Sequence, residues 1–255
     1  YNITMNKQKK TLFSQKTVKI GEESGYDNYI MALESSCDET ACAIVRNGTE
    51  ILANVIYSQI ELHRPYGGVF PELACRQHVD VIIPVIKQAL TQAKLQPSSL
   101  RGIAVTKGPG LIGALLIGLN SAKTLSLAWK VPFVGINHVD AHLYAAMMPP
   151  NTPPPFPCLG LVISGGHTFM VKIEAIGSYR FIGTTQDDAI GEAFDKVAQM
   201  LSLPYPGGPS IEALAKTGNP KAFVFKPCRI KGSPWDFSFS GLKTSVLYAI
   251  KGQNP

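Results

Sequence analysis

The sequence predicts an α/β protein made of two similar halves. Three observations support this: strand-like and helix-like patterns alternate from residue 29 onward, a proline-rich stretch interrupts them at residues 149–157, and a second series of strands follows in the same order. The chain has 255 residues, of which 45% are apolar and 16% charged, and this composition is typical of a folded protein with a substantial core.

Each element of the first half has its own signal. Short apolar runs bounded by polar turns predict strands at residues 29–34, 41–47, 51–58, 102–107 and 132–137. Apolar residues at helical spacing predict helices at residues 72–93 and 113–129. Strands that alternate with helices imply an α/β fold.

The second half repeats the opening of the first. Strands are expected at residues 158–164, 169–175 and 179–185, in the order strand, small-residue turn, strand, strand. Two such halves would face each other across a cleft lined by both turns. We therefore expect an exposed extension at residues 1–28, a first lobe at 29–148, a stiff proline-rich linker at 149–157 and a second lobe at 158–255.

The composition indicates which kind of partner and which cellular compartment to expect. A formal charge of +6 with a pI near 9.0 favours a polyanion such as nucleic acid, although an ordinary basic surface gives the same excess. The five cysteines are odd in number and form no CxxC pair, which predicts a reducing, cytoplasmic compartment without disulfides. Cys37 lies among polar residues and is either a nucleophile or a structural thiol.

No apolar run reaches the roughly 18 residues that a membrane helix needs, so no membrane contact is expected. The longest run, at residues 111–119, suits a buried helix.

Two histidines lie four positions apart, at His138 and His142. On a helix they share one face, where they either bind one metal ion or lie at the surface. A protein zinc site normally has three or four ligands, and the residues alone supply no third. A zinc peptidase would carry glutamate next to the first histidine to activate water, and Val139 stands there instead.

Glycine-rich turns recur along the chain. Residues 108–113, GPGLIG, match a dinucleotide fingerprint, but the acidic residue expected about 20 positions later is missing, so a tight strand-to-helix turn is favoured. Residues 164–168, SGGHT, and 205–212, YPGGPSIE, could bring backbone N–H groups close to an anion. Asp195 lies between them and could accept hydrogen bonds from ribose, so these features together indicate a nucleotide.

Polar clusters leave further alternatives open. ESSCDET, residues 34–40, is either a solvated hairpin or a source of acid–base groups at the cleft. Arg76 and His78 are either surface residues, or Arg76 joins Arg64 and His63 in part of a basic patch for phosphates. SFSGLKTSV, residues 238–246, has the composition of a helix cap with Lys243 in the first turn.

Eight segments occur in an order that resembles the threonylcarbamoyl-transferase family, between about residues 31 and 243. They are ESSCDET, YGGVFPELACRQH, GPGLIGALLIG, NHVDAHLYAA, SGGHT, DDAIGEAFDKVA, YPGGP and DFSFSGLKT. Within the family, the second and sixth segments look more like the bacterial branch than the archaeal one. The resemblance implies the duplicated actin–Hsp70–sugar kinase fold, with two lobes around a nucleotide cleft.

The resemblance also implies a reaction. Threonylcarbamoyl would move from threonylcarbamoyl-adenylate to the exocyclic amine of the adenosine 3′ of the anticodon, in tRNAs that read codons beginning with A. His138 and His142 would bind one divalent metal ion, zinc or iron. The implied contacts to nucleotide or substrate are Val162, Ile163, Ser164, Gly165, Gly166, Asp195, Gly208 and Glu212.

The attacking amine must lose a proton, and Asp38, Glu39 and His167 are the candidate bases because they lie in turns expected at the cleft. The implied partners are tRNA, a small paralogous subunit and a P-loop ATPase.

The sequence departs from the family at its end. The family continues beyond residue 255 with an aspartate that is the third metal ligand and an asparagine at the adenine, so the second lobe is expected to be incomplete here. A non-catalytic nucleotide-binding scaffold, which needs no metal pair, is therefore the alternative.

Overall fold

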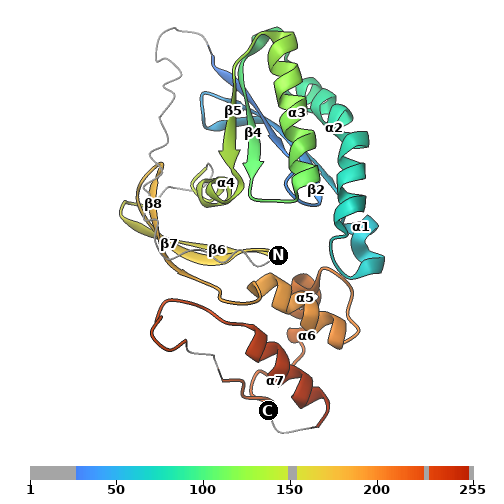
Figure 1. Ribbon diagram of the computed structural model, residues 1–255, viewed down its shortest axis with the longest axis vertical. Coiled ribbons are helices and arrows are strands. Elements are labelled where there is room, and N and C mark those ends of the chain that lie inside the picture. Colours follow the sequence, from blue (N-terminus) through green and yellow to red (C-terminus); the bar gives the residue numbers. More distant parts are fainter. Residues whose placement is uncertain (1–26, 149–153, 227–229, 253–255) are drawn as a thin grey trace.

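The computed structural model describes residues 27–148, 154–226 and 230–252, which form two sheets with helices beside them (Figure 1). The predictions for residues 1–26, and for residues 149–153 of the linker, lie outside the described residues.

The first sheet has five strands in the order β3-β2-β1-β4-β5. β1 pairs antiparallel with β2, and β2 with β3, whereas β1–β4 and β4–β5 are parallel. Each strand predicted from the sequence is present, with its ends displaced by at most two residues. The bounds are β1 Tyr29–Glu34, β2 Glu39–Arg46, β3 Glu50–Ser58, β4 Leu100–Gly108 and β5 Phe133–Asn137.

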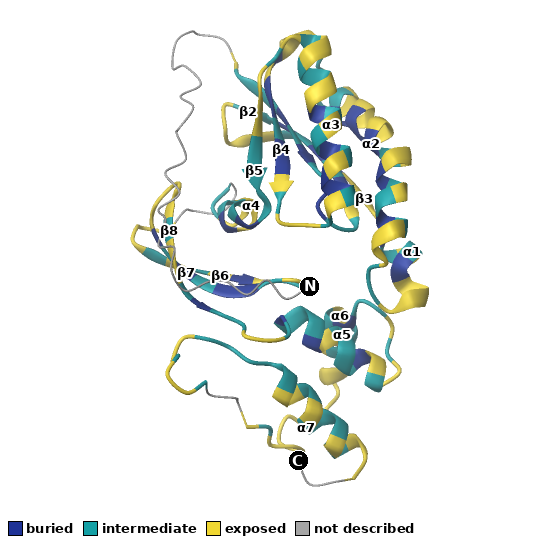
Figure 2. Ribbon diagram, viewed as in Figure 1, coloured by how far each residue is buried: buried dark blue, intermediate teal, exposed yellow. Residues whose placement is uncertain are grey.

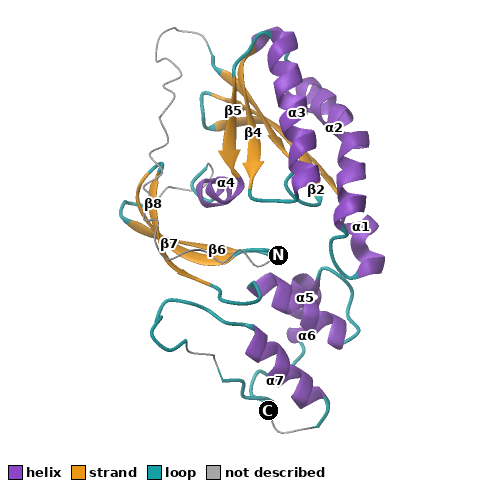
Figure 3. Ribbon diagram, in the orientation of Figure 1, coloured by secondary structure: helices purple, strands orange, loops and turns teal. Residues whose placement is uncertain are grey.

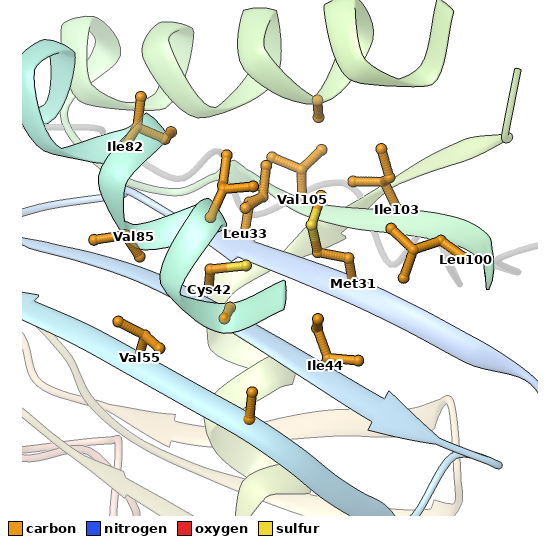
Figure 4. Packing of buried hydrophobic residues seen from close by; sticks show 14 residues of the cluster. Met31, Leu33, Cys42, Ile44, Val55, Ile82, Val85, Leu100, Ile103 and Val105 are labelled. Carbon is orange, nitrogen blue, oxygen red and sulfur yellow. The ribbon is translucent and has the colours of Figure 1, made fainter. Parts of the chain in front are cut away.

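Two long helices, α2 (Pro71–Ala93) and α3 (Ile112–Trp129), lie side by side along this sheet (Figure 3). Short helical turns precede α2 and β4, at α1 (Ile60–His63), η1 (Arg64–Tyr66) and η2 (Pro97–Ser99). Buried side chains of α2 meet those of β1, β2 and β4 in one hydrophobic core (Figure 4). Its fully buried members include Met31, Cys42, Ile44 and Ile103.

The expectation of a buried helix at residues 111–119 is only half right. One face of α3, with Ala114, Gly118 and Ala122, is buried, and α3 packs on β4. The other face is exposed, with Ile112 78% accessible. Among the described helices α3 alone is long and apolar enough to cross a membrane, by length and composition only.

The second sheet repeats the opening of the first. β6 (Cys158–Ile163), β7 (Thr168–Ala175) and β8 (Ser178–Thr184) form an antiparallel sheet in the order β6-β7-β8. The same order and direction relate β1, β2 and β3, so the topology confirms the predicted duplicated α/β fold.

Helix α4 (His138–Ala145) follows β5 in the chain but packs against the second sheet. Its buried Val139 and Leu143 join a cluster with Val162, Phe169, Val171 and Ile173. The apolar side of α4 is thus buried against the face of the second sheet that carries these four side chains. Figure 2 shows α4 and the second sheet coloured by burial.

Helices α5 (Ile190–Met200), α6 (Gly207–Ala215) and α7 (Ser240–Ile250) complete the fold. The cap predicted for α7 is present, but a distant residue supplies it. The Asp187 carboxylate accepts hydrogen bonds from Ser238 Oγ at 2.6 Å and Phe239 N at 2.8 Å, and from both N and Oγ of Ser240. Asp188 binds Lys196 at 2.8 Å and Lys243 at 3.0 Å, which joins α5 to α7.

Candidate functional site

His138 and His142 point at each other from successive turns of α4. Asn137 caps the helix through its side chain, which accepts from Val139 N at 2.8 Å, and this places His138 at the first helical position. The two Nε2 atoms are 3.0 Å apart and the rings are nearly perpendicular, at 86°. Because the nitrogens converge, the pair is not a simple solvated helix face.

The geometry of the pair fits two ligands of one metal ion. Two imidazole nitrogens on a tetrahedral zinc ion lie about 3.3 Å apart, since each Zn–N bond is about 2.0–2.1 Å. In residues 27–148, 154–226 and 230–252, no group of three or more His, Cys, Asp or Glu side chains is placed to hold a metal. The described residues therefore offer two ligands and no third.

The other ring nitrogen of His138 faces a carboxylate. Its Nδ1 lies 3.3 Å from Glu34 Oε2 and 3.1 Å from Ser36 Oγ. Burial of Glu34 by itself would raise its pKa, but hydrogen bonds from His138, Ser36 and Thr106 outweigh burial and lower the pKa to about 2. Glu34 is thus an anionic acceptor behind the first histidine, as in carboxylate–histidine–metal arrangements.

The ESSCDET turn between β1 and β2 is not a solvated hairpin, because Ser35, Ser36 and Thr40 are buried. Ser35 Oγ donates to the carbonyl of Ala114 at 2.9 Å, which ties the turn to α3. Asp38 is half-buried, and Glu39 is exposed with its pKa raised by burial and by Asp38. Burial, and next the charge of Asp38, raises the pKa of the Cys37 thiol to about 12, which favours the structural thiol over the nucleophile.

The prediction of a basic patch or surface histidines at α1 and α2 is wrong for both histidines there. His63 is fully buried, and its Nε2 and Nδ1 bond to Gln59 Oε1 and Phe70 N. His78 is also fully buried; its Nε2 faces the Cys37 carbonyl at 3.0 Å and its Nδ1 faces Thr40 Oγ at 2.6 Å. Arg64 and Arg76 are exposed, whereas both histidines are buried and hydrogen-bonded to other parts of the protein.

The GPGLIG segment packs against the same turn. Leu111 N donates to Ser36 O at 2.8 Å, and a Cβ on Gly110 would lie 2.8 Å from Ser36 Cβ. A Cβ on Gly113 would lie 2.5 Å from Cys75 Sγ. These glycines let protein segments approach each other, as a tight strand-to-helix turn requires.

The SGGHT turn joins β6 to β7 and places His167 near the pair on α4. Ser164 N donates to His167 O at 2.8 Å, and Ser164 Oγ accepts from His167 N at 2.9 Å. The rings of His167 and His138 are 6.1 Å apart. Burial, and then the neighbouring His138 and His142, lower the pKa of His167, so its imidazole is neutral at pH 7.

The glycines of this turn are open on their outer side. A Cβ on Gly165 or Gly166 would meet nothing within 4 Å. The N-terminus of α5 packs beneath them, since a Cβ on Gly191 would lie 2.6 Å from Ser164 O. Backbone N–H groups at such a turn can approach an anion.

Asp195 lies on α5 and supports the start of α6. Its Oδ1 accepts from Gly207 N at 2.7 Å, which leaves the second oxygen for another partner. Burial raises the pKa of Asp195 despite this hydrogen bond. Gly208 is unobstructed and Glu212 is exposed. Within the described ranges, Asp195 and Glu212 make no hydrogen bond to the three histidines near β6.

A cavity of about 340 Å³ lies between α4 and β6, beside His142. Both Val162 and Ile163 line it, together with Leu143 and Met147 of α4 and its C-terminal turn. Its lining is mostly apolar, which suits a carbon skeleton better than a phosphate.

The sequence interpretation missed Glu34 as a site residue. The structure places it at the carboxyl end of β1, beside Thr106 at the same end of the parallel strand β4. Carboxyl ends of neighbouring parallel strands are where α/β proteins place ligands, and that rule could have identified it.

Comparisons with known proteins agree with one another. Residues 50–253 match the family model described as TsaD: tRNA N6-adenosine threonylcarbamoyltransferase. Proteins of that name from Protochlamydia amoebophila and Anaeromyxobacter dehalogenans are 65% and 53% identical, each over 87% of this chain. This chain spans 65% and 66% of their respective lengths.

Two solved structures show weak overall likeness. YeaZ from Pseudomonas aeruginosa has a TM-score of 0.40 at 15% identity, covering 60% of this chain and 64% of its own. The activator of the 2-hydroxyisocaproyl-CoA dehydratase from Clostridium difficile has a TM-score of 0.46 at 12% identity, covering 89% and 66%.

Proposed function

The chain belongs to the tRNA N6-adenosine threonylcarbamoyltransferase family, and we propose that the protein performs the transfer for which that family is named. The donor is threonylcarbamoyl-adenylate and the acceptor is the exocyclic amine of the adenosine 3′ of the anticodon, in tRNAs that read codons beginning with A. The amine nitrogen forms a bond to the carbamoyl carbon, the bond from that carbon to the phosphate oxygen breaks, AMP leaves and the amine loses one proton.

The observation that carries this proposal is the convergence of His138 and His142 beside the SGGHT turn. The pair would hold one divalent ion, zinc or iron, which would polarise the carbonyl of the threonylcarbamoyl group when bound. Imidazole ligands suit either metal. The described residues place no third His, Cys, Asp or Glu side chain beside this pair to hold a metal.

The nucleotide part of the donor would lie along β6 and its turn. Open backbone at Gly165 and Gly166 suits the phosphate, and the free Asp195 oxygen suits a ribose hydroxyl. Val162, Ile163, Ser164, Gly208 and Glu212 complete the proposed set. The apolar cavity beside His142 provides room for the less polar part of the donor.

The proton of the amine would pass to Asp38, Glu39 or His167. His167 is neutral and lies near His138, so it can accept a proton. Glu39 is exposed with a raised pKa, which makes it a stronger base than an ordinary glutamate. A positioned base contributes about 10²–10⁴ in rate.

The proposed partners are tRNA, a small paralogous subunit and a P-loop ATPase, and the proposed compartment is the cytoplasm. The formal charge of +6 is compatible with a tRNA backbone.

The test is transfer of labelled threonine from threonylcarbamoyl-adenylate to a tRNA transcript, with the partner proteins present. We expect label in the tRNA, and none when guanosine replaces the adenosine 3′ of the anticodon, because guanosine carries an oxygen at the ring position where adenosine carries the amine. His138→Ala combined with His142→Ala should abolish metal retention and transfer, whereas Asp80→Ala, exposed on α2, should change neither. No label with verified partners would refute the proposal.

A second candidate is a non-catalytic nucleotide-binding scaffold. A scaffold of this kind needs no metal ligands, so it does not depend on the convergence of His138 and His142. A scaffold would retain no zinc or iron, and its nucleotide affinity would survive the double histidine substitution. Metal analysis of the purified protein therefore separates the two candidates.

A further inference from the structure

His138 Nδ1 has two polar neighbours of different character. Ser36 Oγ lies 3.1 Å away and Glu34 Oε2 lies 3.3 Å away. A hydroxyl can donate to a bare ring nitrogen or accept from a protonated one, so Ser36 tolerates either tautomer. A carboxylate only accepts, so Glu34 is compatible with the tautomer that carries hydrogen on Nδ1.

Glu34 is held in place by donors from two strands and a turn. Its Oε1 accepts from Ser36 N at 2.5 Å, and its Oε2 accepts from Thr106 Oγ at 2.5 Å. Glu34 ends β1, and Thr106 lies on the adjacent strand β4. With both oxygens engaged and the side chain only 31% exposed, the carboxylate cannot turn away from His138 without breaking these bonds.

We propose that Glu34 is a positioning residue, which fixes the proton of His138 on Nδ1 and so leaves Nε2 unprotonated and directed at His142. The use of that nitrogen as a metal ligand rests on the proposed function, whereas the tautomer itself does not. Glu34 touches neither substrate nor metal in this scheme and acts through the ring of His138.

The proposal also determines which of the two rings carries the hydrogen that lies between them. The Nε2 atoms are 3.0 Å apart, so one of them must donate to the other in the metal-free protein. Since His138 Nε2 is the acceptor, His142 Nε2 carries the hydrogen. His142 is exposed, and moving that hydrogen to its own Nδ1 frees both Nε2 atoms for one ion.

The first measurement is long-range ¹H–¹⁵N correlation NMR of histidine-labelled, metal-free protein at a pH where imidazoles are neutral. The signals of His138 are assigned by their loss in His138→Gln. We expect a protonated Nδ1 and an unprotonated Nε2 in the wild type. Glu34→Gln should reverse this pattern, because the isosteric amide can donate to Nδ1, and Glu34→Ala should give a mixture, since Ser36 serves both tautomers.

The second measurement is Zn²⁺ affinity by competition with a chromophoric chelator. Glu34→Gln should weaken binding about 10- to 100-fold, the usual effect of removing a partner behind a metal-bound histidine. The matched control is Ser36→Ala, which removes the other neighbour of Nδ1 and should leave affinity and tautomer close to wild type.

Three results would overturn the proposal: an unprotonated Nδ1 in the wild type, an unchanged tautomer in Glu34→Gln, or an equal loss of affinity in Ser36→Ala. A protein that shows the expected tautomers but transfers no threonylcarbamoyl would refute the proposed function and leave the role of Glu34 intact. Because the NMR readout needs neither metal nor tRNA, the two failures are distinguishable.

Discussion

Gly110 should be the position where one added methyl group disturbs the fold and the site together. A Cβ at this residue would lie 2.8 Å from Ser36 Cβ and 3.0 Å from Ser36 Cα, and it would lie even closer to the carbonyl oxygen of Ser36. Ordinary contact begins near 3.4 Å, so the turn would have to retreat by about 0.6 Å or more. The φ of Gly110 is not in the left-handed region, so the effect is one of space alone.

Two costs follow for Gly110→Ala. Overpacking in a well-packed region costs about 1–3 kcal/mol. The retreat of Ser36 also stretches its 2.8 Å hydrogen bond from Leu111 N, which is worth about 1 kcal/mol. We therefore expect the free energy of unfolding to fall by about 2–4 kcal/mol in total. The same movement disturbs the hydrogen bond from Ser36 N to Glu34 Oε1, and with it the contact between Glu34 and His138.

Urea unfolding followed by circular dichroism measures this loss. Gly68→Ala is the matched control: its Cβ would meet nothing within 4 Å, and the substitution should raise stability by about 0.4–1 kcal/mol through the unfolded chain. If Gly110→Ala unfolds at the same urea concentration as Gly68→Ala, the close approach of residues 36 and 110 is refuted.

Three further predictions concern other parts of the molecule. Asp187→Ala removes all four hydrogen bonds to the start of α7 and should cost about 1 kcal/mol, with faster amide exchange in the first turn of α7; the exposed Asp80→Ala should show neither effect. Burial lowers the pKa of His78 below the 6.5 of an unfolded histidine. Below pH 6.5 the unfolded chain therefore takes up a proton that the folded protein does not. The free energy of unfolding should fall as the pH drops below 6.5. His78→Asn should flatten this dependence in urea titrations without abolishing it, because His142 and His167 have the same sign; an unchanged slope would contradict the assignment. Burial raises the pKa of both Cys37 and Cys42 to about 12. Iodoacetamide should therefore label neither thiol in the folded protein and both after unfolding, and peptide mass mapping would show this. Labelling of Cys37 in the folded protein would argue against a structural thiol.

The sequence was sufficient for the strands and the long helices because their signals are local. Runs such as YIMALE and CLGLVI become β1 and β6 because apolar side chains alternate or cluster at strand spacing. The duplication was visible for the same reason, since the order of elements repeats even where the residues differ.

The sequence did not predict which polar side chains are buried. ESSCDET is polar by composition, yet Ser35 and Ser36 are buried because residues about 75 positions later, at the start of α3, cover them. His78 has the sequence context of a surface histidine, but it lies against Thr40 from a strand 38 positions earlier. Glu34 was missed as a partner of His138 for the same reason, since 104 positions separate them. Such contacts depend on long-range pairing, which no local pattern reports.

Helix α4 follows β5 of the first sheet in the chain, but its buried apolar side chains pack with the second sheet. Its apolar side chains lie in the second sheet's cluster, the Asp140 carboxylate accepts a hydrogen bond from the Tyr179 hydroxyl, and the Tyr144 hydroxyl accepts from Gly177 N at 2.6 Å. Glu34 and Ser36, by contrast, are anchored in the first sheet. The contact between Glu34 and His138 therefore links the two sheets through α4: the carboxylate ends β1 of the first sheet, and the ring lies on a helix whose apolar side chains are buried against the second sheet.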